Sequence, residues 1–267
     1  MKLSKDYNMR SQRCLFIVFL LFFVPNLVEA KELIWDEDSI SNATPLLAQK
    51  LDDGRLSIGS STIVSKDDRY FILTASHVSK VLKNDSKIIF RLSGDKPQIV
   101  DLLPIAKNRS IDWKQHPIAD IAIIELDVID ESIRTLIGNY AFPAEMIYRD
   151  KELPPRGADL TFLGYPVLDL DMEHFSPLIF TAYRSSGLIT QKRADTKTKC
   201  NFYYLNEPSI QGCSGSGLYL SVKKSTMYLN FGRTLMIGIV HGTHGDNTGG
   251  KLAAITPSYY IFDLFEH

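Results

Sequence analysis

The sequence lacks the marks of several protein classes. No cluster of Lys or Arg stands out, and the formal net charge is −1, so the basic face that nucleic-acid binding usually needs is absent. There is no fixed-period repeat and no low-complexity tract. The composition of the 267 residues, 45% hydrophobic and 23% charged, is typical of a globular protein with a sizeable core. We therefore expect one large domain or two small ones packed together, and no nucleic-acid partner.

Cysteine is scarce, with three in the whole chain. Cys14 belongs to an apolar run near the N-terminus, which leaves Cys200 and Cys213 in the rest of the sequence. In an oxidising compartment these two could form a disulfide that braces the glycine-rich segment around Cys213. Two buried free thiols are the alternative.

The N-terminus has the layout of a secretory signal peptide. A basic start is followed by the apolar run 14–24, then by Pro25 and by small residues up to Ala30. The run is shorter than the roughly 20 residues of a membrane span. We expect cleavage after Ala30, a chain of residues 31–267 with no stable membrane span, and a secreted or periplasmic location. An uncleaved N-terminal anchor is the alternative.

Short β-rich runs broken by turns make up most of the remaining chain, which predicts an all-β sandwich or barrel. Helices are predicted at residues 76–83 and 256–265, the second opening with a capping Thr256 and with Pro257 at the first helical position. Turn-rich residues 140–157 divide the chain into halves of similar length. The predicted strands are residues 57–64, 70–74, 87–92, 121–126, 159–164, 186–190, 202–205, 217–221 and 235–240.

The segment Gln211-Gly-Cys-Ser-Gly-Ser-Gly217 carries a candidate nucleophile. A serine hydroxyl needs a base to take its proton, and Gly212 and Gly215 permit the tight turn that would expose Ser214. The amides of Gly212 and Ser214 would then form an oxyanion hole. Ser216 is a rival, but serine rather than glycine lies two positions before it. Taken alone, the segment is more typical of a glycine-rich hairpin with incidental serines.

A histidine and an aspartate supply the other groups that such chemistry needs. His77 follows the apolar run 70–74, and its imidazole can accept and return a proton near neutral pH. Asp120 stands at the start of the apolar strand 121–126, where a buried carboxylate needs a partner such as a histidine N–H. Taken alone, either residue fits a structural role better, as a histidine at a strand end or an exposed aspartate in a turn.

Together, and in the order His, Asp, Ser, these segments resemble the trypsin- and chymotrypsin-like serine peptidases. Thr74-Ala-Ser-His77 resembles their Thr-Ala-Ala-His motif, and Asp120-Ile-Ala-Ile-Ile resembles Asp-Ile-Ala-Leu. Gly212-Cys-Ser-Gly-Ser-Gly217 resembles Gly-Asp-Ser-Gly-Gly, in a version closest to bacterial branches such as the glutamyl endopeptidases and the HtrA-like peptidases. The spacings agree, and the resemblance covers nearly all of residues 31–267.

The resemblance implies two six-stranded antiparallel barrels, at about residues 31–145 and 155–267, with a C-terminal helix. It also implies a serine endopeptidase that acts on proteins or peptides without a metal or an organic cofactor. Ser214 would attack the peptide carbonyl, His77 would act as general base and then acid, and Asp120 would orient His77. Water would then hydrolyse the acyl-enzyme.

The same resemblance suggests where the substrate side chain would bind. Pro208 stands where trypsin-like enzymes have Asp, so a preference for Lys or Arg is not expected. His241 lies one place away from the histidine that glutamyl endopeptidases use, which leaves a Glu or Asp preference open. His241 and His244 could also indicate a metal, but two ligands without a third favour a solvated loop. The expected walls of the pocket contain Pro208, Ser209, Val240, His241 and Thr243.

Two further expectations concern the activation of the protein and a second function class. Cys213 replaces the Asp that pairs with a new N-terminus in trypsin-like enzymes, so we expect no activation switch of that type. A catalytically silent relative that acts as a binding module is the second function class. Such relatives usually lose a triad member, whereas this chain keeps all three and Gly212, so we favour the active peptidase. The sequence does not indicate an oligomeric state.

Overall fold

The computed structural model describes residues 34–166, 173–193, 195–222, 233–245 and 247–266. The predicted signal peptide and its cleavage site lie outside these residues. Within the described ranges, no helix has both the length and the apolar character needed to cross a membrane.

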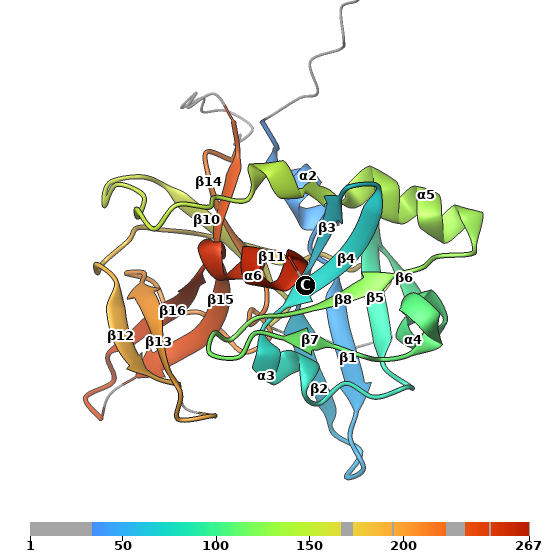
Figure 1. Cartoon of the computed structure of the whole chain (residues 1–267), viewed down its shortest axis with the longest axis horizontal. Coiled ribbons are helices and arrows are strands. Elements are labelled where there is room, and N and C mark those ends of the chain that lie inside the picture. Colours follow the sequence, from blue (N-terminus) through green and yellow to red (C-terminus); the bar gives the residue numbers. More distant parts are fainter. Residues whose placement is uncertain (1–33, 167–172, 194, 223–232, 246, 267) are drawn as a thin grey trace, which may run out of the picture. The chain divides into compact units, whose positions relative to one another are not determined.

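Two sheets are built from the first half of the described chain (Figure 1). One has the strand order β2-β1-β5-β6, and the other has the order β7-β8-β4-β3-β9. Neighbouring strands are antiparallel except for β3 and β9. The strands are β1 (Leu46–Lys50), β2 (Leu56–Ser60), β3 (Thr62–Lys66), β4 (Arg69–Thr74), β5 (Lys87–Leu92), β6 (Lys96–Asp101), β7 (Lys114–Gln115), β8 (Ala122–Leu126) and β9 (Phe142–Pro143).

A single seven-stranded antiparallel sheet is built from the second half, in the order β11-β10-β14-β15-β16-β13-β12. Its longest strand, β15, pairs with both β14 and β16 and has an irregularity in register near Val240. The strands are β10 (Leu160–Gly164), β11 (Leu178–Ala182), β12 (Ile189–Lys192), β13 (Lys199–Tyr204), β14 (Gly217–Leu220), β15 (Leu235–Gly245) and β16 (Lys251–Pro257).

The helices are short and lie at the ends of strands. The longest, α5, begins after Asp130, whose carboxylate accepts hydrogen bonds from the N–H groups of Ser132 and Ile133 and so caps the helix. The α-helices are α2 (Glu37–Asn42), α3 (Ser76–Ser79), α4 (Leu102–Ile105), α5 (Glu131–Tyr140) and α6 (Phe262–Phe265). The 3-10 helices are η1 (Lys107–Arg109), η2 (Ala144–Met146) and η3 (Ser258–Ile261).

The predicted class, antiparallel β with a short C-terminal helix, is confirmed. The strands form four-, five- and seven-stranded sheets, however, rather than two closed six-stranded barrels. The C-terminal helix also starts later than predicted. Thr256 and Pro257 remain in β16 because they pair with Ile239 and Gly238 of β15, and helical structure starts at Ser258.

Side chains from both halves share one hydrophobic cluster, which holds the sheets around the candidate site. Tyr219 of β14 is fully buried and packs edge-on against Phe142 of β9, with ring centroids 5.3 Å apart. This distance is within the range of about 4.5–7 Å that is usual for such pairs. The same cluster contains Leu73 of β4 and Ile121, which directly precedes β8. The strand ends that carry the candidate catalytic side chains are therefore anchored in the core.

Candidate active site

Strand pairing brings His77 and Asp120 together. Thr74, the last residue of β4, pairs with Ala122, the first residue of β8. The turn after β4 therefore lies beside the turn before β8. His77, in α3, donates its backbone N–H to Asp120 Oδ1 at 3.0 Å, and its Nδ1 lies 2.7 Å from Asp120 Oδ2.

Asp120 is fully buried and accepts two further hydrogen bonds from the second half of the chain. His241 Nδ1 lies 2.5 Å from Oδ2, and Arg193 Nη2 donates to Oδ1 at 2.9 Å. Burial by itself would raise the pKa of Asp120, but the hydrogen bonds from His241 and His77 outweigh it and hold that pKa far below its ordinary value. Because an ionised carboxylate only accepts, both imidazoles must present Nδ1–H, which leaves Nε2 of a neutral His77 free to accept a proton.

Ser214 lies on a tight turn between two glycines with positive φ, Gly212 at +94° and Gly215 at +93°. Ser60, at the end of β2, holds this turn from the first half of the chain. Its N–H donates to the Ser214 carbonyl at 2.8 Å, and its hydroxyl donates to the Gly212 carbonyl at 2.7 Å. Within the described ranges, the amides of Gly212 and Ser214 donate to no other group. Both N–H groups are thus available for an oxyanion.

The Ser214 hydroxyl donates to the backbone carbonyl of His241 at 3.1 Å. The described residues contain no hydrogen bond between Ser214 and His77, although both lie against His241, whose ring centroid is 5.6 Å from that of His77. Catalytic hydrogen bonds often form only once substrate is bound. The rival serine, Ser216, is fully buried, donates to the Gly217 carbonyl and accepts from the amide of Leu163, so its role is structural.

The residues predicted to line the substrate pocket do not all line one cavity. Ser209 and Thr243 meet, with their hydroxyl oxygens 3.0 Å apart. Val240 is fully buried in a core cluster, so its side chain supports the site rather than lining it. His241 and Thr243 line a cavity of about 270 Å³, whereas Pro208 and Ser209 do not. The other lining residues are Gln191, Lys192, Arg193, Phe202, Gly242, His244 and Gly245.

The disulfide between Cys200 and Cys213 is not formed, and both side chains are buried free thiols. The two cysteines point into different clusters. Cys213 packs in the core of the seven-stranded sheet with Leu160, while Cys200 packs beside Phe202 in a separate cluster. Burial raises the pKa of Cys200 to about 12 and that of Cys213 to about 11.

A metal ion could in principle be held by His77, Asp120 and His241, whose donor atoms all lie within 4.8 Å of one another. Both Nδ1 atoms, however, point at the same carboxylate oxygen at hydrogen-bond distances, and the positive charge of Arg193 adjoins that carboxylate. This geometry fits protonated Nδ1 atoms better than a coordinated cation. His244 does not join the group, since its Nδ1 lies 3.3 Å from the Tyr204 hydroxyl.

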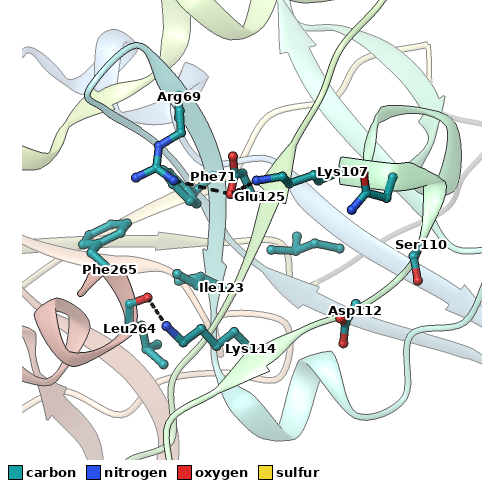
Figure 2. Close-up of a pocket in the computed structure, with 12 residues that line it drawn as sticks. Arg69, Phe71, Lys107, Ser110, Asp112, Lys114, Ile123, Glu125, Leu264 and Phe265 are labelled. Atoms are coloured by element: carbon teal, nitrogen blue, oxygen red, sulfur yellow. Dashed lines mark hydrogen bonds and ion pairs between the residues drawn. The ribbon is translucent and has the colours of Figure 1, made fainter. Parts of the chain in front are cut away.

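A second cavity, of about 350 Å³, lies between α6 and strands β4 and β8, and none of the predicted site residues lines it (Figure 2). Three of its charged side chains form ion pairs, and a fourth bonds the backbone. Glu125 accepts from Lys107 at 2.9 Å and lies 3.6 Å from Arg69, and Lys114 donates to the Leu264 carbonyl at 2.7 Å (Figure 2). The cavity contributes no group to the candidate site.

Three residues of the site were missed by sequence reasoning or given another role. Arg193 and Ser60 were not singled out, and His241 was assigned to the substrate pocket alone. A buried carboxylate such as Asp120 requires a hydrogen-bond donor or a positive charge beside it. This requirement indicates that residues such as Arg193 and His241 must exist, although it does not identify them. Ser60 stands in a run of small residues before the histidine, a weak signal for close backbone contact.

No protein-family model matches the chain, and no curated protein matches it. Solved structures do. The Rv3671c protease of M. tuberculosis in its active form is 17% identical, with a TM-score of 0.53 over 86% of this chain and 82% of that chain. Its inactive form matches at 16% identity and a TM-score of 0.51, over 86% of this chain and 90% of that chain.

The HtrA-type protease AlgW, solved with a tripeptide, matches at 16% identity and a TM-score of 0.53. The match covers 85% of this chain but only 60% of AlgW. At these identities the likeness shows the fold. The chain therefore has the fold of chymotrypsin-like serine proteases.

Proposed function

We propose that this chain is a serine endopeptidase with His77, Asp120 and Ser214 as its catalytic triad. The observation that carries the proposal is the buried Asp120, which accepts from both the backbone and the ring of His77 at 3.0 and 2.7 Å. Ser214 projects from a glycine turn against His241, which bonds the same carboxylate. The shared fold with Rv3671c and AlgW, which are proteases, and the tripeptide in the AlgW structure support a peptide substrate.

In the proposed reaction, the Ser214 hydroxyl leaves the His241 carbonyl and donates to Nε2 of His77. His77 takes the proton as Ser214 Oγ attacks the peptide carbonyl, and Asp120 stabilises the imidazolium. The negative charge on the carbonyl oxygen develops beside the amides of Gly212 and Ser214. His77 then protonates the leaving amine, and water hydrolyses the acyl-enzyme.

Labelling with a fluorophosphonate tests this proposal. Wild type should be labelled covalently and Ser214→Ala should not, because the reagent bonds an activated serine oxygen and the proposal assigns that role to Ser214. Ser216→Ala should still be labelled, since its hydroxyl is buried in backbone hydrogen bonds. Unlabelled wild type that cleaves no member of a peptide library would instead support the silent binding module.

We also propose that the chain is exported, on the strength of residues 1–30. The mature protein should then begin at Lys31. N-terminal sequencing of the protein recovered outside the cytoplasm tests this, and an intact Met1 in that fraction would contradict cleavage.

A further inference from the structure

Arg193, at the end of β12, buries a full positive charge beside Asp120. Its side chain is 2% exposed, and Nη2 donates to Asp120 Oδ1 at 2.9 Å. Nη1 donates to the Ala119 carbonyl at 2.7 Å, one residue before the carboxylate. A buried guanidinium is tolerated only when its donors are satisfied and its charge is compensated, and both conditions are met here.

The other side of the same guanidinium reaches the helix that carries His77. Arg193 Nε and Nη2 donate to Asp195 at 2.9 and 2.7 Å, and Lys80 Nζ donates to Asp195 Oδ2 at 2.8 Å. Lys80 is the C-cap residue of α3. Arg193 and Asp195 therefore connect the second half of the chain both to the carboxylate of the proposed triad and to the helix of its base.

Arg193 also affects how Asp120 is shared between two imidazoles. His77 and His241 both bond Asp120 Oδ2, at 2.7 and 2.5 Å. Rotation of the carboxylate towards His241 would lengthen the bond to His77. Arg193 and the His77 N–H fix Oδ1 at 2.9 and 3.0 Å, so Oδ2 stays within reach of His77.

We propose that Arg193 is a positioning residue that acts through Asp120, keeping its carboxylate oriented towards His77. This proposal rests on the proposed function. Arg193 does not touch the reacting atoms, and although it adjoins the cavity of about 270 Å³, its side chain is only 2% exposed there. Its loss should therefore lower turnover with little change in substrate binding.

The test compares Arg193→Met, Arg193→Lys and the control Arg184→Met in peptide hydrolysis and fluorophosphonate labelling. Arg184 is another arginine of the second half, only partly buried, and it donates to the carbonyls of Pro154 and Ser186. Within the described ranges it forms no hydrogen bond with a proposed catalytic residue. We expect Arg193→Met to lower kcat by about 10²-fold, the loss typical of a misplaced catalytic group, with KM nearly unchanged. Arg193→Lys should recover part of the loss, and Arg184→Met should behave as wild type.

A double-mutant cycle with Asp120→Asn separates action through Asp120 from a general structural effect. If Arg193 acts through the carboxylate, Arg193→Met should slow labelling much less in the Asp120→Asn background than in wild type. An equal loss in both backgrounds, or the same loss in Arg184→Met, overturns the proposal. Should Arg193→Met fail to fold, the same cycle is run with Arg193→Lys.

A spectroscopic measurement keeps this proposal distinct from the proposed function. In Ser214→Ala protein, the Nδ1–H of His77 and that of His241 should each give a strongly downfield proton resonance. Arg193→Lys should move the His77 resonance, and Arg184→Met should leave it unchanged. An unmoved His77 resonance refutes positioning by Arg193. Wild type that neither cleaves peptides nor is labelled refutes the proposed peptidase. In that case the resonances still report whether Arg193 orients the hydrogen bond between Asp120 and His77.

Discussion

Gly215, the residue after the proposed nucleophile, combines two constraints that an alanine would violate. Its φ of +93° lies in a region that L-residues with a Cβ adopt at a cost. A Cβ at this position would also lie 2.1 Å from the Ser60 carbonyl oxygen and 2.2 Å from Thr74 Oγ1. Neither neighbour can move freely, because Thr74 Oγ1 donates to that same Ser60 carbonyl at 2.8 Å.

The two constraints contribute separately to the free energy of unfolding. The left-handed backbone costs an alanine about 1–2 kcal/mol, and overpacking a rigid neighbourhood costs about 1–3 kcal/mol. We therefore expect Gly215→Ala to lose about 2–5 kcal/mol, a large share of the roughly 5–15 kcal/mol that stabilises a typical domain.

Two other glycines provide controls for the two constraints. Gly54 has a φ of +82° but no heavy atom within 4 Å of an added Cβ, so Gly54→Ala should cost only the backbone part, about 1–2 kcal/mol. Gly187 has neither a positive φ nor a close neighbour, so Gly187→Ala should change stability by less than about 0.5 kcal/mol. Urea unfolding of the three variants measures these differences as shifts of the midpoint at constant slope.

The order Gly187, Gly54, Gly215 is the essential result. If Gly215→Ala is no less stable than Gly54→Ala, the close approach of Ser60 and Thr74 is wrong. A Gly215→Ala protein that keeps both full stability and full labelling would also remove the argument that glycine is needed to shape the turn of Ser214.

Three further results are expected. His241→Ala removes a hydrogen bond from a buried carboxylate, so it should raise the pKa of Asp120 and lower the free energy of unfolding by about 1–3 kcal/mol in urea titrations; an unchanged stability would contradict the bond. Hydrogen bonds from Arg193 and Lys80 outweigh partial burial and lower the pKa of Asp195 to about 2, so its stabilisation is present above about pH 4 and is lost as pH falls towards 2. Asp195→Asn should flatten that part of the acid unfolding curve, and an unaltered curve would argue against the ion pairs. Cys200 and Cys213 should react slowly with a thiol reagent in the native protein because burial raises both pKa values. In the protein that begins at Lys31, which lacks Cys14, two thiols should titrate after unreduced denaturation, and none would indicate a disulfide.

Strands with continuous aliphatic or β-branched residues were predictable from the sequence, and strands defined by their partners were not. Residues 87–92 match β5 at both ends. β15 was predicted to end at Val240, but it continues to Gly245 because its polar second part pairs with β16 from Gly242 onward. Helix α5 was missed, although Asp130 and the apolar residues that follow it provide the signature of a capped amphipathic helix.

The residues of the candidate site likewise differ in whether local sequence could predict them. His77, Asp120 and Ser214 could be singled out because each depends on its own local backbone: a helical turn after a strand, a residue before a buried strand, and a turn between glycines. Arg193 and His241 bond Asp120 across 73 and 121 residues of sequence, and nothing in their own segments marks them as partners of Asp120.

A buried carboxylate at the start of a strand does predict that some cation or donor will meet it. The chain offers 30 Lys and Arg and 6 His as candidates, however, and the choice among them is made only when the seven-stranded sheet packs against the strands that carry His77 and Asp120. Local sequence can therefore specify which groups would react. The partners that orient those groups are specified by the packing of the two halves. The same three motifs could therefore occur in an active enzyme, where the packing orients them, or in a silent relative, where it does not. Arg193 lies at this junction, so its substitution tests the orientation of the proposed triad while its three members remain in place.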